Sequence, residues 1–337
     1  QAEDGIRDVE RSRGLGDVYK RQVLLLSMVV KGDIQMKTVF YKKTMYISAV
    51  IFFIVLISGS HSYGWSKEKE FNVTSNYERW RSLGEFIAEF ALDSLEKRAV
   101  RPQKTGLIVM TNAGYSEIGM ESTQAVLDGL SSSTGATRGR HTLVEVHSAL
   151  WDPLWCAFYD RKSGYCVYLE VDSSKMEIKT FPLTPELFSR MGIERINAEY
   201  LFKHSSEWQR KFKENIFGGN EFRIITIANA IASGAPTSVV RAFEFHDHYC
   251  PGVTSGILMA EYLKAHFPPG KGGYFVHTVE PWCKEDALLV LLNATPGKRG
   301  YAVCYPTKED KARRVPGVEN ASTIIYRQNE GSKKWEG

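Results

Sequence analysis

The sequence predicts an α+β fold, with a mixed β-sheet and helices packed on one face. Apolar residues recur at helical spacing in some segments, while short apolar or alternating runs bounded by turn residues lie between them. The chain has 337 residues, a length typical of about two domains. Hydrophobic residues make up 43% and charged residues 24%, which excludes disordered and polytopic membrane proteins.

The first 62 residues are expected to lie outside the folded part. Residues 1–35 show no apolar periodicity, and we interpret them as an artefactual leader before a natural start at Met36. Residues 36–62 follow the order of a signal peptide: lysines, the uncharged run Met45–Ser58, then small residues. That run is short for a spanning helix, which needs about 20 apolar residues. The sequence therefore predicts export to the periplasm or the medium, with an uncleaved membrane anchor as the alternative.

Charge excludes one class of partner. The formal net charge is +4, but most of the excess lies in residues 1–62, and the remainder is close to neutral with no basic stripe. The sequence therefore lacks the clustered basic residues that nucleic-acid binding requires. Phosphate-binding glycine loops and serine-nucleophile motifs are also missing from the sequence, so nucleotide-dependent chemistry and serine hydrolysis are not expected.

A first α+β domain is expected over residues 63–175. Helical spacing predicts helices over 75–97 and 117–130, and apolar runs predict strands over 105–111 and 142–149. Residues 154–171 are typical of two strands around a turn at 160–164. In that hairpin Cys156 and Cys166 lie symmetrically about the turn, so they form either a disulfide or two reduced core thiols.

The second half is expected to contain a helical connection over 176–220, a metal-binding domain over 221–310 and a polar tail over 311–337. Within it, residues 221–240 look helical with a break at Gly234 and Pro236. Further elements are predicted as a helix over 255–266, strands over 273–279 and 301–305, and a turn over 295–300.

The two halves resemble each other weakly. Residues 114–130 can be laid on 247–263, which indicates either a degenerate duplication or a chance likeness of two α+β units. In that alignment Tyr115 and Glu117 stand where the second half has His248 and Cys250. Only the second half would then carry a ligand cluster.

The strongest chemical signal is the segment 245–252, FHDHYCPG. His246, His248 and Cys250 occur within five residues, and imidazole and thiolate are the ligands that zinc-like transition metals prefer. In an extended stretch, alternation would point all three side chains to one side. The alternative is a Cys250 thiolate that acts as a nucleophile or redox thiol without a permanent metal.

A second cluster follows at residues 279–287, VEPWCKEDA. Cys283 can complete the site of His246, His248 and Cys250 from another element. Glu280 and Asp286 can ligate, orient a histidine or move protons, and with Cys250 they are the candidate catalytic residues. Four bound protein ligands would close the site, whereas three would leave a position open.

These motifs resemble the E-subunit family of formylmethanofuran dehydrogenase. The likeness rests on the HxHxCPG stretch, the Glu280–Cys283–Asp286–Ala287 pattern and the Thr295–Lys298 turn, over residues 221–306. It implies an α+β domain with a mixed sheet, a His/Cys site for a transition metal, most often zinc, and dimerisation as in relatives. A small molecule or a metallated cofactor is the further partner that such a site implies. The chain departs from the family at Asp247, where glycine is usual.

Overall fold

The computed structural model describes residues 76–102, 106–176, 183–313 and 321–337. The predicted leader and signal peptide lie outside the described residues. The fold is α+β, as predicted, with two mixed sheets and helices packed on them. Among the described helices, none is long and apolar enough to cross a membrane.

The first sheet has five strands in the order β4-β1-β5-β6-β7. β1 pairs parallel with β4 and antiparallel with β5, and the remaining pairs are antiparallel. Four of the strands lie where the sequence predicts them, and β7 lies in the expected helical connection, ahead of the helices α5 and α6. The bounds are β1 (Leu107–Thr111), β4 (Leu143–Glu145), β5 (Trp155–Asp160), β6 (Tyr165–Val171) and β7 (Phe188–Arg195).

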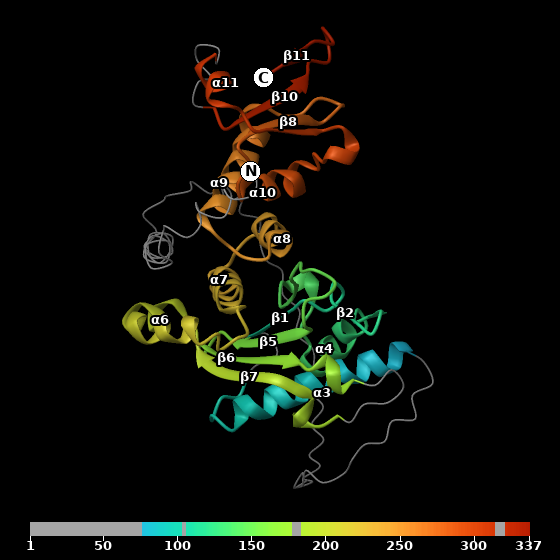
Figure 1. Cartoon of the computed structure of the whole chain (residues 1–337), viewed down its shortest axis with the longest axis vertical. Coiled ribbons are helices and arrows are strands. Elements are labelled where there is room, and N and C mark those ends of the chain that lie inside the picture. The colour runs from blue at the N-terminus through green and yellow to red at the C-terminus, as the bar shows by residue number, and fades with distance from the viewer. Residues whose placement is uncertain (1–75, 103–105, 177–182, 314–320) are drawn as a thin grey trace, which may run out of the picture.

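Helices cover both faces of this sheet, and not one face as predicted, because every residue of β1 and β5 is buried. One face packs against α3 and α4, and the other against α5, α6, α7 and part of α8. Figure 1 shows α3 and α7 on opposite sides of β5 and β6. The bounds are α3 (Asn76–Glu96), α4 (Val126–Thr134), α5 (Ala198–Lys203), α6 (Ser205–Lys213), α7 (Glu221–Ala232) and α8 (Thr237–His246).

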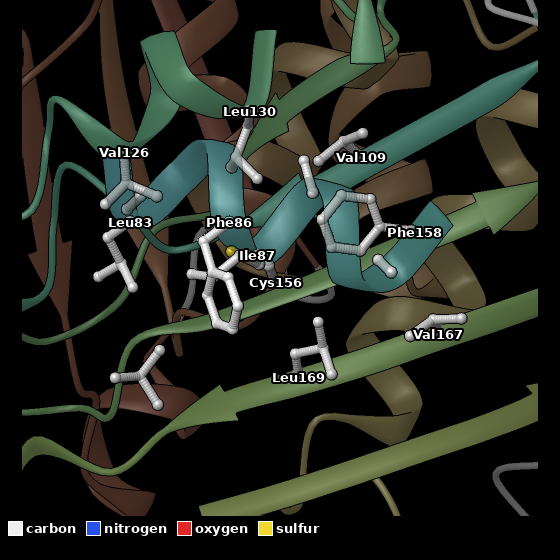
Figure 2. Close-up of a cluster of buried hydrophobic side chains, with 14 of the residues drawn as sticks. Leu83, Phe86, Ile87, Val109, Val126, Leu130, Cys156, Phe158, Val167 and Leu169 are labelled. Carbon is white, nitrogen blue, oxygen red and sulfur yellow. The ribbon is translucent and has the colours of Figure 1, made fainter. Parts of the chain in front are cut away.

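The core between α3 and the first sheet follows the helical period seen in the sequence. Leu83, Phe86 and Ile87 of α3 belong to one buried cluster with Phe158 of β5 and Leu169 of β6 (Figure 2). Each of these side chains is buried. Burial contributes roughly 1.5–3 kcal/mol for each such side chain, so this cluster anchors α3 on the sheet.

The second sheet has the order β11-β10-β8-β9, and helices cover one of its faces. Tyr274, Val276 and Thr278 of β8 are buried towards α9 and α10, and the alternate residues are half-buried. The expected polar tail supplies β10 and β11, because the run Thr323–Tyr326 is β-branched and aromatic. The bounds are α9 (Pro251–His266), β8 (Tyr274–Val279), α10 (Lys284–Leu292), β9 (Tyr301–Cys304), β10 (Thr323–Gln328) and β11 (Trp335–Glu336).

The chain contains two units of the same topology. The first unit runs from α3 to β6 (76–171), and the second unit runs from α9 to β11 (251–336). In each, the strand after the first helix pairs parallel with the strand after the second helix and antiparallel with the next one. The registers match: Val109 lies opposite Leu143 in the first unit, and Val276 lies opposite Tyr301 in the second.

The two helices of each unit also cross in the same way. A Cβ added to Gly84 of α3 would lie 2.3 Å from the Val126 carbonyl oxygen of α4. One added to Gly256 of α9 would lie 2.3 Å from the Lys284 carbonyl oxygen of α10. Glycine is therefore required at both crossings, since any side chain would push the helices apart.

Two similar units exist, but the sequence alignment of 114–130 with 247–263 is wrong. Residues 251–266 form α9, whereas 117–122 form the hairpin β2 (Glu117–Ile118) and β3 (Glu121–Ser122), where a helix was expected. Gly119 and Met120 have φ values of 60° and 65°, and these left-handed residues make the turn of the hairpin. The helix that follows, α4, starts at Val126.

The two hairpin cysteines do not form a disulfide. Cys166 of β6 lies opposite Tyr159, three residues from Cys156, so the two side chains are on opposite faces of the sheet. Cys156 packs towards α3 and Cys166 towards α7. Both thiols are free, and burial raises the pKa of Cys156 to about 12 and that of Cys166 further.

The two units meet at α8. Val240 and Phe243 of α8 pack into the core of the first sheet, and Ala242 packs with Val253 and Ala287 of the second unit. The backbone nitrogen of His147 donates to the Glu244 carbonyl at 2.9 Å. α8 therefore carries its last residues from the first unit to the start of the second (Figure 1).

Candidate metal centre

His246 is the last residue of α8, and the chain turns sharply after it. Asp247 has a φ of 67°, in the left-handed region, and ends the helix. This is the position at which the resembling family has glycine, and aspartate is one of the few other residues that tolerate it. The predicted extended stretch is therefore wrong at His246, which is helical, and at Asp247, which is left-handed.

Cys250 caps the next helix. Pro251 begins α9, and the Val253 backbone nitrogen donates to Cys250 Sγ at 3.4 Å. The N-terminal end of a helix stabilises negative charge, so this position favours a thiolate. Thr254 donates from its hydroxyl to the Cys250 carbonyl at 3.0 Å, which fixes the first turn.

Cys283 reaches the site from the start of α10, where it is the residue before the first helical position. Gly252 makes the approach close enough: a Cβ there would lie 2.6 Å from the Cys283 Cβ. The starts of α9 and α10 are thus pressed together, and the two thiols meet between them. The sequence predicts this meeting through the position of Cys283, and the structure confirms that both clusters form one site.

His246, Cys250 and Cys283 form the one group of three metal-ligating side chains found among the described residues. One ligand atom of each lies within 4.8 Å of the others, and Cys250 Sγ lies 3.8 Å from His246 Nε2. A tetrahedral zinc ion with bonds of about 2.0–2.3 Å separates its ligand atoms by about 3.5–3.8 Å. The donor set and its spacing therefore fit a zinc-like transition metal.

Asp286 orients the histidine. Its Oδ2 lies 2.6 Å from His246 Nδ1, one turn into α10. A carboxylate on Nδ1 holds the proton there and leaves the Nε2 lone pair directed at the thiols, an arrangement common behind metal-bound histidines. Of the roles predicted for Asp286, the structure shows the orienting one.

His248 and Glu280 lie outside this group. The His248 ring centroid is 4.4 Å from that of His246, but His248 Nδ1 is bonded to Asp247 Oδ1 at 2.5 Å. Asp247 is in turn paired with Arg223 at 2.8 Å. Glu280 is exposed after β8, with a φ of 56° and its backbone nitrogen bonded to the Cys304 carbonyl. Cys304 lies half-buried on β9.

The three side chains perturb one another's pKa values. Burial lowers the pKa of His246, but hydrogen bonds with Asp286 and Cys283 outweigh it and raise this pKa to about 9. The hydrogen bond between the two thiols lowers the pKa of Cys250 and raises that of Cys283.

Glu285 is a supporting residue that the sequence analysis did not single out. It is 4% exposed and accepts hydrogen bonds from the Trp282 backbone nitrogen, the Thr278 hydroxyl and the Lys284 ammonium group. The bond to Trp282 caps the start of α10, next to Cys283. An acidic residue in the first turn of a helix, here two residues after Cys283, is the sequence signal that could have identified it.

Residues 245–328 match the protein-family model FmdE, described as "FmdE, Molybdenum formylmethanofuran dehydrogenase operon". The chain carries an FmdE domain. It begins at the last turn of α8, includes His246, Cys250 and Cys283, and ends with β10. No curated protein and no solved structure matches the chain. The match confirms the predicted likeness, but over residues 245–328 and not over 221–306, and the first unit lies outside it.

Proposed function

We propose that the FmdE domain binds one zinc-like transition metal ion through His246 Nε2 and the sulfurs of Cys250 and Cys283. The observation that carries this proposal is the convergence of these atoms within 4.8 Å, from three different helices. Two thiols and an imidazole form a donor set of the kind that holds zinc.

The surrounding residues prepare the ligands. Asp286 holds the imidazole in one tautomer, and Glu285 fixes the start of α10 and so the position of Cys283. The N-terminal end of α9 favours the thiolate form of Cys250. A bound zinc-like ion supplies Lewis acidity and lowers the pKa of a coordinated water.

Three protein ligands leave a fourth position for an exogenous molecule, which is the arrangement of catalytic and not of structural zinc sites. His248 is the residue that would close the site, and it lies outside the group of three whose ligand atoms converge. An open position accommodates a small substrate or a group of a metallated cofactor, and we assign the domain to this class of site.

The test is elemental analysis of the purified chain, for wild type and for Cys250→Ser, Cys283→Ser and His248→Ala. Cys304→Ser is the matched control, because it removes a thiol from a neighbouring strand outside the group. We expect about one equivalent of metal in wild type, His248→Ala and the control, and at least a tenfold loss in the other two. Metal retained in Cys250→Ser and Cys283→Ser would contradict the proposed ligand set.

The competing function is thiol chemistry at Cys250 without a metal. It is favoured by the same cap position, where Val253 donates to the sulfur. Alkylation by iodoacetamide separates the two. A metal-binding site protects Cys250 until a chelator is added, whereas a free catalytic thiol reacts at the same rate with and without the chelator.

We also propose that the protein is exported, with the mature chain starting near Ser60 or Ser62. The lysines, apolar run and small residues of 36–62 support this. Sequencing the N-terminus of the protein from the periplasm of a bacterial host tests it: retention of residues 36–62 would contradict cleavage. A homodimer is proposed from the family likeness alone, and sedimentation of the purified chain measures it.

A further inference from the structure

The first unit has a cleft at the place where the second unit has its metal ligands. The cleft has a volume of about 550 Å³ and lies between the first turns of α3 and α4 and the hairpin β2–β3. In the second unit the starts of the equivalent helices, α9 and α10, carry Cys250 and Cys283. Both units thus use the same corner of the fold.

The first unit differs from the second at two positions beside this cleft. Ala125 precedes the first residue of α4, as Cys283 precedes that of α10, and alanine offers no ligand atom. Trp80 lies four residues before the crossing glycine Gly84, where the second unit has Gly252 before Gly256. A bulky indole therefore stands in the first unit where Gly252 lets Cys283 approach Cys250 in the second.

A longer connection supplies the outer wall. The segment between β1 and α4 spans 112–125, whereas the segment between β8 and α10 spans 280–283. The additional residues form β2 and β3, and Met120 to Ser122 of this hairpin line the cleft. A cavity of this size falls within the range of small-molecule sites.

The polar groups of the cleft point to a cationic ligand. Glu121 and Asp128 are the two charged residues among those that line it, and both are acidic. Trp80 Nε1 donates to Glu121 Oε2 at 2.9 Å, and the Tyr77 hydroxyl donates to Asp128 Oδ2 at 2.9 Å. Among the described residues each carboxylate accepts these bonds through one oxygen, and its other oxygen can accept from a donor on a ligand.

The aromatic and apolar residues that line the cleft can contact the carbon groups of an organic cation. Tyr77 is 48% exposed at the mouth, and Leu127 and Met120 add apolar surface. Arg79 forms an ion pair with Glu121 and offsets part of its negative charge. Asp128 should therefore attract a cationic ligand more strongly than Glu121 does. Aromatic rings attract ammonium groups through their negative faces.

We propose that this cleft, lined by Tyr77, Trp80, Glu121 and Asp128, is a binding site for a small organic ammonium ion. The site is separate from the metal ligands of the FmdE domain and does not depend on them. It makes the chain a protein with two sites at equivalent corners of two similar units, one for a metal and one for an organic cation.

The experiment is calorimetric titration of the full chain with choline and with its neutral isostere 3,3-dimethylbutan-1-ol. We expect saturable binding of choline and about tenfold weaker binding of the alcohol. Asp128→Asn should weaken choline binding about tenfold, and Tyr77→Leu should weaken it about threefold to fivefold. Glu89→Gln removes the same charge from an exposed position of α3 and should leave the affinity within twofold of wild type.

Circular dichroism confirms that each variant is folded, and metal content checks that the FmdE domain is intact. The proposal is overturned if folded wild type shows no saturable heat with choline. It is also overturned if the neutral alcohol binds as tightly, or if Asp128→Asn binds choline like wild type. A loss that appears equally in Glu89→Gln would show a surface charge effect and would contradict the assigned site.

Discussion

The first and second units share strand order, register and helix crossing, yet they differ at the starts of their two helices. The second unit has Cys250 and Cys283 there, whereas the first has Ala125 and a cleft beside Trp80. The comparison teaches that the scaffold and its site are separable. The glycine crossings and the parallel strand pair keep the helices in place, and the residues at the helix starts decide which chemistry that corner offers.

The units also differ in what covers their sheets. Helices α5 to α8 cover the second face of the first sheet, whereas the described helices cover one face of the second sheet. The first sheet thus has two cores, with Tyr159, Tyr168 and Trp208 buried in the second of them. We expect the first unit to dominate the stability of the chain, since it buries more apolar surface.

The largest predicted effect is a loss of stability on substitution of the glycines at the helix crossings. Gly84→Val and Gly256→Val each place a side chain against a backbone carbonyl 2.3 Å away, so each should destabilise its unit by about 3 kcal/mol. Urea unfolding followed by circular dichroism measures this. Gly139→Val is the control, because nothing lies within 4 Å of a Cβ there. Equal stability of Gly84→Val and the control would disprove a shared crossing.

Removing the carboxylate behind His246 should have the next largest effect. Asp286→Asn keeps the size of the side chain but weakens the bond to Nδ1, so metal affinity should fall about 10–100-fold. Competition with a chromogenic chelator measures the affinity. Asp128→Asn, in the first turn of α4, is the matched control and should leave metal affinity unchanged. A fall of the same size in that control would remove the distinction between the two units.

A smaller effect is expected at Asp247, which ends α8 with a φ of 67°. Asp247→Ala loses the ion pair with Arg223 and places alanine in the left-handed region, so the chain should lose about 1 kcal/mol. Asp247→Gly loses the same pair but relieves the backbone, and it should be close to wild type. Thermal unfolding ranks the variants; alanine and glycine with the same stability would contradict the assigned strain.

The smallest effect is expected from reduction. Cys156 and Cys166 lie on opposite faces of the first sheet, so dithiothreitol should not change the melting temperature of a variant that carries both Cys250→Ser and Cys283→Ser. Their pKa values are raised by burial, and both thiols should resist alkylation at neutral pH until denaturant is added. A lower melting temperature after reduction would indicate a cross-link that the fold does not allow.

The elements best predicted from the sequence are those with a clear period. The spacing of Leu83, Phe86 and Ile87 identifies α3 within one residue at each end, and the turn at Gly164 identifies the hairpin of β5 and β6. The hairpin at 117–122 was missed because Ile118 and Met120 fit a helical period, while the left-handed turn depends on backbone angles that the pattern does not show.

The sequence predicted which residues belong to the candidate site better than it predicted their geometry. Cys250, Cys283, His246 and Asp286 follow from residue type and spacing, and the structure brings all four together. His248 lies outside the group of three, with its ring 4.4 Å from that of His246, and its predicted role as a ligand stays a prediction. The alignment of the units failed because it set α9 against the hairpin β2–β3 and the start of α4, whereas the crossing glycines match α9 with α3.

The central claim is that the second unit binds a metal and the first does not. X-ray absorption at the metal edge of the purified wild-type chain, combined with its metal content, tests this most directly. We predict one zinc-like ion per chain, with two sulfur ligands at about 2.3 Å and a nitrogen ligand at about 2.0–2.1 Å. Two ions per chain, or one ion with no sulfur ligand, would contradict it.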